Sequence, residues 1–154
     1  TENTWDLGSL SRTAWVDYGI HDNPRASGLA SGTNFVYIQE KGDDNDGSPM
    51  TSYIESADFD LGDGEQFMFV SRLIPDIDIT SSDAEASVNY VLKTRNYPGD
   101  SLVTNSTSAI QATTEQAFLR SRSRQASLRI ESSTTDITWT LGDLRLDLRP
   151  DGRR

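Results

Sequence analysis

The chain has a single histidine, and His21 is the natural first candidate in a search for an active site. It is followed by Asp22 in the turn-rich stretch GIHDNP, and a His–Asp pair is half of a proton-transfer system. No strong nucleophile motif accompanies this pair, since the chain has neither a G-x-S-x-G stretch nor a cysteine. We therefore interpret His21 as an exposed loop residue, and the sequence predicts no catalytic residue and no enzyme.

Two acidic stretches contain the oxygen ligands that calcium prefers. The first, GDDNDG at 42–47 (Asp43 to Asp46 with its glycines), resembles a calcium loop in spacing but lacks the downstream glutamate. A hairpin turn held by Asp and Asn side chains is the preferred interpretation. In the second, SADFDLGDGE, Asp58 and Asp60 alternate onto one strand face, where a solvated surface is preferred to a cation site. The sequence therefore predicts no metal site and no cofactor, with a cation at either stretch left open.

Tryptophans provide the third kind of candidate, because an exposed indole can stack on a sugar ring. The chain has three, Trp5, Trp15 and Trp139. Each lies in a strand-like alternation, where tryptophan more commonly belongs to the core. We expect core positions for them, with carbohydrate binding as the alternative.

The charge is large, negative and unevenly distributed. The net charge is −10, which argues against a nucleic-acid binder because phosphate neutralisation needs clustered positive charge. Residues 115–154 nevertheless hold 8 basic and 6 acidic side chains. Such a dipolar surface suits head-to-tail contact between copies, although exposed strand faces carry some charge in any case. No apolar run approaches the length of a membrane span, and no membrane contact is expected.

Apolar and polar residues alternate with the period of a β-strand along most of the chain. The predicted strands are 13–18, 34–40, 51–62, 66–79 with an interruption at Pro75, 86–95, 116–122, 124–132, 137–141 and 144–149. Pro98 and Gly99 predict a type II turn, and the Ser/Thr-rich residues 101–114 are expected to form a loop. A helix over 108–120 is the weaker alternative, since its apolar residues do not recur at helical spacing.

Eight or nine short strands at this spacing predict an all-β fold, an antiparallel β-sandwich of jelly-roll-like or barrel-like type. We expect residues 1–20 to form an N-terminal strand segment, the remnant of an upstream domain or blade. Residues 21–154 are expected to form the sandwich itself. The chain starts without a methionine, which favours a fragment of a longer protein.

Two parts of the chain carry a more specific pattern. One is TWDLGSLSRTAWVDYGI with PMTSYIESADFDLGDGEQFMFVSRLIPD, and the other is SRSRQASLRIES with WTLGDLRLDLRPDGRR. Together they resemble the C-terminal region of tailed-bacteriophage structural proteins, most nearly the large tail-tube or nozzle proteins of podovirus-like phages. The resemblance covers roughly residues 4–20, 49–78 and 118–154. Members of that group are several times longer and end on an Arg-rich strand pair.

The resemblance implies a non-enzymatic virion protein, made in the bacterial cytoplasm, that works by assembly with copies of itself and with neighbouring tail proteins. A homo-oligomer is then expected, with no specific nucleic-acid partner. The basic ribbon is expected to face a neighbouring subunit. The candidate interface residues are Arg120, Arg122, Arg124, Arg129, Arg145 and Arg149. The alternative function is a carbohydrate- or receptor-binding β-sandwich module of a phage tail tip.

Overall fold

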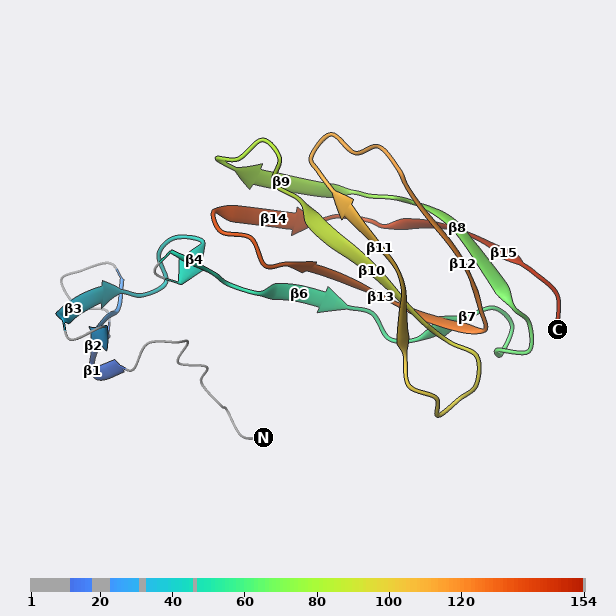
Figure 1. Cartoon of the computed structure of the whole chain (residues 1–154), viewed down its shortest axis with the longest axis horizontal. Coiled ribbons are helices and arrows are strands. Elements are labelled where there is room, and N and C mark those ends of the chain that lie inside the picture. Colours follow the sequence, from blue (N-terminus) through green and yellow to red (C-terminus); the bar gives the residue numbers. More distant parts are fainter. Residues whose placement is uncertain (1–11, 18–22, 31–32, 46, 154) are drawn as a thin grey trace. The chain divides into compact units, whose positions relative to one another are not determined.

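The computed structural model describes residues 12–17, 23–30, 33–45 and 47–153 (Figure 1). These residues form antiparallel strands and no helix, which confirms the all-β prediction and rules out the helix considered over 108–120. The chain divides into two compact units, residues 1–46 and 47–154. The division thus follows Asp46, whereas the sequence analysis placed a boundary between residues 20 and 21.

Unit 1 contains a three-stranded antiparallel sheet in the order β1-β2-β3. The strands are β1 (Arg12–Val16), β2 (Arg25–Ala30) and β3 (Thr33–Ile38), and the two-residue β4 (Asp44–Asn45) follows. Backbone bonds lengthen the β2–β3 hairpin, because the Gln39 amide donates to the Pro24 carbonyl at 2.8 Å. Strand β2 was not predicted, since RASGLA shows no clear alternation of apolar and polar residues.

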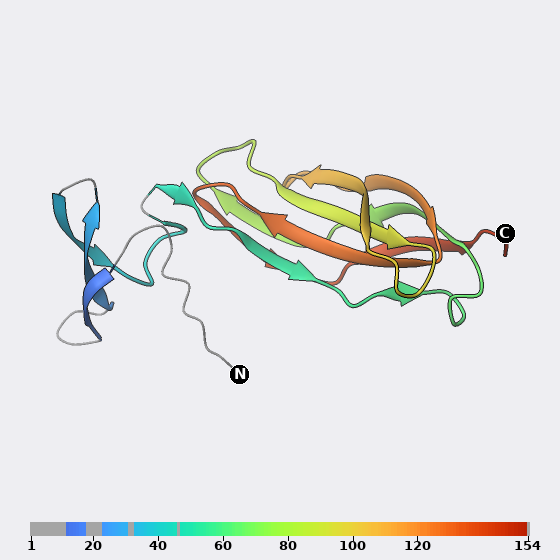
Figure 2. The same ribbon diagram turned by 60° about the horizontal axis from the view of Figure 1, so that its bottom comes forward.

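Unit 2 is a two-layer antiparallel β-sandwich (Figures 1 and 2). We call its first layer sheet 1, in which β11-β10-β13-β6 follow one another and β7 pairs with β13. After the two-residue β5 (Ser48–Pro49), these strands are β6 (Ser52–Glu55), β7 (Phe59–Asp60), β10 (Val88–Arg95), β11 (Val103–Ile110) and β13 (Gln125–Ser132). The hairpin between β10 and β11 contains the predicted turn, since the Asp100 amide donates to the Tyr97 carbonyl and Gly99 has φ 93°.

The second layer consists of two ladders. The first ladder has the order β12-β8-β15, and we call it sheet 2; the second pairs β9 with β14. The strands of the whole second layer are β8 (Met68–Ile74), β9 (Ile77–Ser81), β12 (Ala117–Ser123), β14 (Ile137–Leu141) and β15 (Arg145–Pro150). Along the chain β9 continues β8, and β15 continues β14, so two long strands are each interrupted once (Figure 1).

The core lies between the two layers and is filled from alternate positions of the central strands. The alternation predicted for residues 86–95 and 124–132 is confirmed. From sheet 1 come Val88, Tyr90, Leu92, Ala126, Leu128 and Ile130, and from sheet 2 Met68, Val70, Leu73, Ala117 and Leu119. Because the side chains of a strand point alternately to its two faces, the intervening residues form the outer faces of the sandwich.

The prediction of a loop over 101–114 is wrong for most of its length. Residues Val103–Ile110 form β11, which pairs with β10 so that Ile110 lies opposite Val88. Ser106 and Ser108 lie opposite Leu92 and Tyr90 and take the place of apolar side chains at this edge of the sheet.

Among the described residues, no helix is long and apolar enough to cross a membrane.

A contact of Asp76 with the backbone of Gly142 and Asp143 connects the two interrupted strands of the second layer at their interruptions. Asp76 follows Pro75, which ends β8 because proline has no N–H to donate to a ladder. The backbone carbonyl of Asp76 accepts from the Gly142 amide at 2.8 Å, and its carboxylate accepts from the Asp143 amide at 3.0 Å. A Cβ on Gly142 would lie 2.5 Å from that carboxylate, so a larger residue would push the exposed Asp76 side chain aside and break its bond to the Asp143 amide.

We therefore expect Gly142→Ala to lower the free energy of unfolding by about 1 kcal/mol, the usual effect of losing one hydrogen bond, because the displaced Asp76 carboxylate no longer accepts from the Asp143 amide. Urea denaturation measures it. In an Asp76→Ala background the same substitution should cost less than half as much, because the clashing carboxylate is gone. Equal losses of unfolding free energy in the two backgrounds would show that the Asp76 carboxylate does not determine the effect of the substitution.

Candidate functional site

The six arginines predicted to form an interface do not share one surface. Arg120 and Arg122 lie on β12, and Arg145 and Arg149 lie on β15, all at exposed positions of sheet 2. Arg129 lies on β13 in sheet 1. The basic ribbon of the sequence is therefore divided between the two layers of the sandwich.

Strand register brings arginine and phenylalanine together on the outer face of sheet 2. Phe69 on β8 lies directly between Arg122 on β12 and Arg149 on β15. The guanidinium of Arg149 lies 4.7 Å from the centre of the Phe69 ring, and that of Arg122 lies 3.9 Å from the Phe67 ring. We call this surface the arginine–phenylalanine face. Its residues are Phe67, Phe69, Phe118, Arg120, Arg122, Arg145 and Arg149.

The face keeps an excess of positive charge after its internal ion pairs are counted. Arg72 pairs with Asp147, and Arg122 pairs with Asp151 at 2.6 Å. Within the part of the chain that the structure describes, Arg120, Arg145 and Arg149 have no carboxylate within ion-pair distance. Three guanidinium groups are thus open to an anionic partner, in a unit that carries more acidic than basic residues.

Arg124 has a structural task and is a poor candidate for an interface. One terminal nitrogen donates to the Gly64 and Glu65 carbonyls at 3.2 Å, and the other donates to the Arg153 carbonyl at 3.2 Å. Its guanidinium also lies 4.8 Å from the centre of the Phe67 ring. Arg124 therefore ties the turn before β8 to the segment that follows β15.

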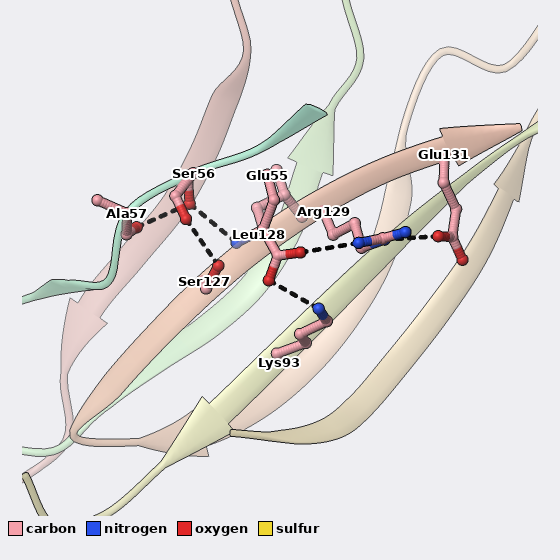
Figure 3. Close-up of polar contacts among 8 residues, drawn as sticks. All are labelled: Glu55, Ser56, Ala57, Lys93, Ser127, Leu128, Arg129 and Glu131. Carbon is pink, nitrogen blue, oxygen red and sulfur yellow. Dashed lines mark hydrogen bonds and ion pairs between the residues drawn. The ribbon is translucent and has the colours of Figure 1, made fainter. Parts of the chain in front are cut away.

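Arg129 belongs to an ionic network on the outer face of sheet 1 (Figure 3). Its guanidinium donates to Glu131 and, at 3.0 Å, to Glu55, while Lys93 donates to the other oxygen of Glu55 at 2.7 Å. We call these four residues the Glu55 network. The Arg129 guanidinium also lies 3.7 Å from the centre of the Tyr53 ring, so its charge is satisfied within the chain.

Next to this network, Ser56 fastens the end of β6 to β13 (Figure 3). Its amide donates to the Leu128 carbonyl at 2.9 Å, and its hydroxyl accepts from the Leu128 amide at 3.0 Å. Its carbonyl accepts from the Ser127 hydroxyl at 2.9 Å. These bonds hold Glu55 in place between its two cations.

Hydrogen bonds from Lys93 and Arg129 lower the pKa of Glu55 below its ordinary value. A carboxyl group whose pKa is lowered by folding stabilises the protein at pH values above its ordinary pKa. This contribution is lost as the pH falls through the folded-state pKa. We expect Glu55→Gln to reduce the urea midpoint slightly at pH 7 and by less at about pH 3, because the contribution is lost as the pH falls. Glu65→Gln is the control, because Glu65 reaches Arg153 only at 4.0 Å. An equal effect of Glu55→Gln at both pH values would contradict the network's contribution.

The other candidates from the sequence fall in different settings. Asp58 pairs with Arg95, and Asp60 accepts from the Gln125 side-chain amide at 3.2 Å, so both carboxylates have partners on the outer face of sheet 1. Trp139 packs against the core as predicted, and its indole donates to Ser52 at 3.0 Å. Trp15 is 55% exposed, so the core prediction is wrong for it. His21, Trp5 and Asp46 lie outside the described residues.

No group of three or more acidic or histidine side chains within the described ranges is placed to hold a metal ion. Sequence reasoning missed the phenylalanines of sheet 2, because residues 67–70 are all apolar and show no alternation of apolar with polar side chains. The alternation of Phe67 and Phe69 with Met68 and Val70 was the available signal. Comparisons with protein-family models and with curated proteins found no match for this chain.

Proposed function

We propose that the protein is a non-enzymatic structural component of a phage tail, of the tube or nozzle type, that works by assembling with other tail subunits. The single observation that carries the proposal is the arginine–phenylalanine face. Arginine and aromatic residues are enriched in protein interfaces, where each supplies contact area together with a polar or stacking interaction. The resemblance of the Arg-rich closing strands to tail proteins supports the same assignment.

The rigid two-layer sandwich suits such a role. An assembling subunit must present its contact residues at fixed positions, and regular strands do this better than loops. Arg122 and Arg149 are fixed in this way by the register of β12, β8 and β15. The proposal includes no catalytic step and assigns no cofactor.

Immunogold electron microscopy tests the proposal. Antibodies raised against residues 47–154 are applied to purified particles from a lysate of the bacterial strain that carries the gene. Gold on the tails is the expected result. Unlabelled tails, in particles whose denatured proteins also fail to react on a blot, would overturn the proposal.

A second function is favoured by one observation, the exposed indole of Trp15. Stacking of a sugar ring on this side chain would make the protein a carbohydrate-binding module of a tail tip. A glycan array with wild-type protein and Trp15→Ala tests it. Binding that is lost in the variant would support this function, and an array without signal would exclude it.

A further inference from the structure

We propose that copies of this chain bind one another by placing the arginine–phenylalanine face of one copy against the β9–β14 end of another. The inference deepens the proposed function, on which it rests, by naming the two surfaces that meet. It begins from the charges of the second layer, which are separated along its strands.

The β9–β14 end carries acidic residues without basic ones. Asp78 is exposed on β9, Asp83 and Glu85 follow β9, and Asp136 precedes β14. Residues 75–87 and 133–144 contain no lysine or arginine. None of these four carboxylates forms an ion pair with a described residue. We call these four residues the acidic end.

Most of the two charged surfaces is too far apart to interact within one copy. Phe69, which lies opposite Arg122 and Arg149, and Asp78 belong to one interrupted strand and are nine positions apart, which at the rise of a β-strand is roughly 30 Å. This distance exceeds the screening length at physiological salt several times over, whereas Arg145, opposite Ile74, lies four positions from Asp78, or roughly 13 Å. A second copy, displaced along the strand direction, brings opposite charges into contact.

The acidic end also has a shape that a second copy can approach. Its exposed strand positions beside Asp78 are Thr80, Thr138 and Thr140, which are short side chains. The arginine–phenylalanine face offers three guanidinium groups without a carboxylate partner and the Phe118 ring, which is 56% exposed. Charge complementarity and an apolar contact are therefore available together, as in the centre and rim of a specific interface.

The backbone of Arg120 gives an independent indication that this face is kept for binding. Arg120 has φ 46°, in the left-handed region that glycine adopts without strain and arginine does not. It lies at the irregularity between Phe118 and Ser121 in the pairing of β12 with β8. An arginine held in a strained conformation on an exposed strand indicates a role beyond folding.

The experiment measures the mass of the whole chain in solution by light scattering at low (about 50 mM) and high (about 500 mM) salt, since exposed ion pairs are screened by salt. Wild-type protein is expected to form a dimer or larger assembly at low salt and to dissociate at high salt. A monomer at every concentration and salt would overturn the inference. Labelled tails would still support the proposed function, so the two failures are distinguishable.

Two sets of variants identify the surfaces. The basic-face variant carries Arg120→Gln, Arg145→Gln and Arg149→Gln, and the acidic-end variant carries Asp78→Asn, Asp83→Asn and Asp136→Asn. Each alone should associate at least tenfold more weakly than the wild type. A mixture of the two should form a one-to-one complex. In this complex the acidic-end variant supplies the basic face and the basic-face variant supplies the acidic end. Absence of this complex, with both variants folded, would overturn the inference.

The matched control places the same charge change on the opposite sheet. Thr104→Glu, Thr107→Glu and Ala109→Glu lie at exposed positions of β11 and, like the basic-face variant, make the net charge more negative by three. This variant should associate like the wild type, and an equal loss would show that net charge alone controls association. Arg120→Gly provides a second check, because it should raise the unfolding midpoint while weakening association.

A polyanion is the competing occupant of the same face. Titration with single-stranded poly-dT, followed by fluorescence anisotropy, tests it. Tight binding that the basic-face variant loses, together with a wild type that does not self-associate, would assign the face to nucleic acid and overturn the inference.

Discussion

Replacing Ile130 with alanine is expected to lower the free energy of unfolding by about 2–5 kcal/mol, whereas the same change at Ile54 should cost less than about 1 kcal/mol. The two isoleucines lie directly opposite each other on β13 and β6 and face the same side of sheet 1. Ile130 is 2% exposed and Ile54 is 51% exposed. The comparison therefore varies burial while residue type, sheet face and strand pairing stay the same.

Urea denaturation of both variants measures the difference. Ile130 also lies opposite Tyr90 on β10, so its removal opens a cavity in the middle of the layer, where neighbouring side chains cannot collapse freely. Ile54 is on the edge strand, where water already reaches it. Similar losses for the two variants would show that the core does not lie between the central strands.

Alkaline pH is expected to destabilise the protein through Tyr90. Burial, with a smaller contribution from the Asp76 carboxylate, raises the pKa of Tyr90 to about 12. An unfolded tyrosine titrates near pH 10, so between pH 10 and 12 the unfolded state releases a proton that the folded state retains. Stability therefore falls as the pH rises through this window, by about 2–3 kcal/mol in total.

Tyr90→Phe should remove this alkaline loss and cost little at pH 7. The Tyr90 hydroxyl is buried and has no hydrogen-bond partner among the described residues, so its deletion breaks no bond. Urea midpoints from pH 8 to pH 12 provide the measurement. Tyr97→Phe is the control, since this side chain is exposed and its loss should leave the pH dependence unchanged. A Tyr90→Phe curve parallel to that of the wild type would refute the assignment.

Alternation along the sequence was sufficient to predict the fold class and most central strands, because side chains that alternate between core and water leave a two-residue period. It failed at β11, where Ser106 and Ser108 occupy inward positions at a sheet edge. There the backbone pairing with β10 determines the strand, and the composition resembles that of a loop. Pairing between distant segments leaves no such local signal.

The same limit applies to the candidate interface. Alternation showed that Arg122, Arg129 and Arg149 face away from the core, and the structure agrees. Alternation did not show that β13 belongs to one sheet while β12 and β15 belong to the other, because a strand in either sheet has the same two-residue period. Only the three-dimensional arrangement separates Arg129, which is neutralised by Glu55 and Glu131, from the arginines left open on sheet 2.

The pairing of β8 with β15 has a consequence for the order of folding. Ser71 donates to the carbonyl of Asp147, 76 positions further along the chain, and closing so long a loop is slow. The β10–β11 hairpin, by contrast, closes over one short turn. A nascent chain would therefore form that hairpin early and leave both edges of the apolar strand Met68–Ile74 unpaired until β12 and β15 are made. During that interval these edges are the part of the domain most open to pairing with the wrong chain.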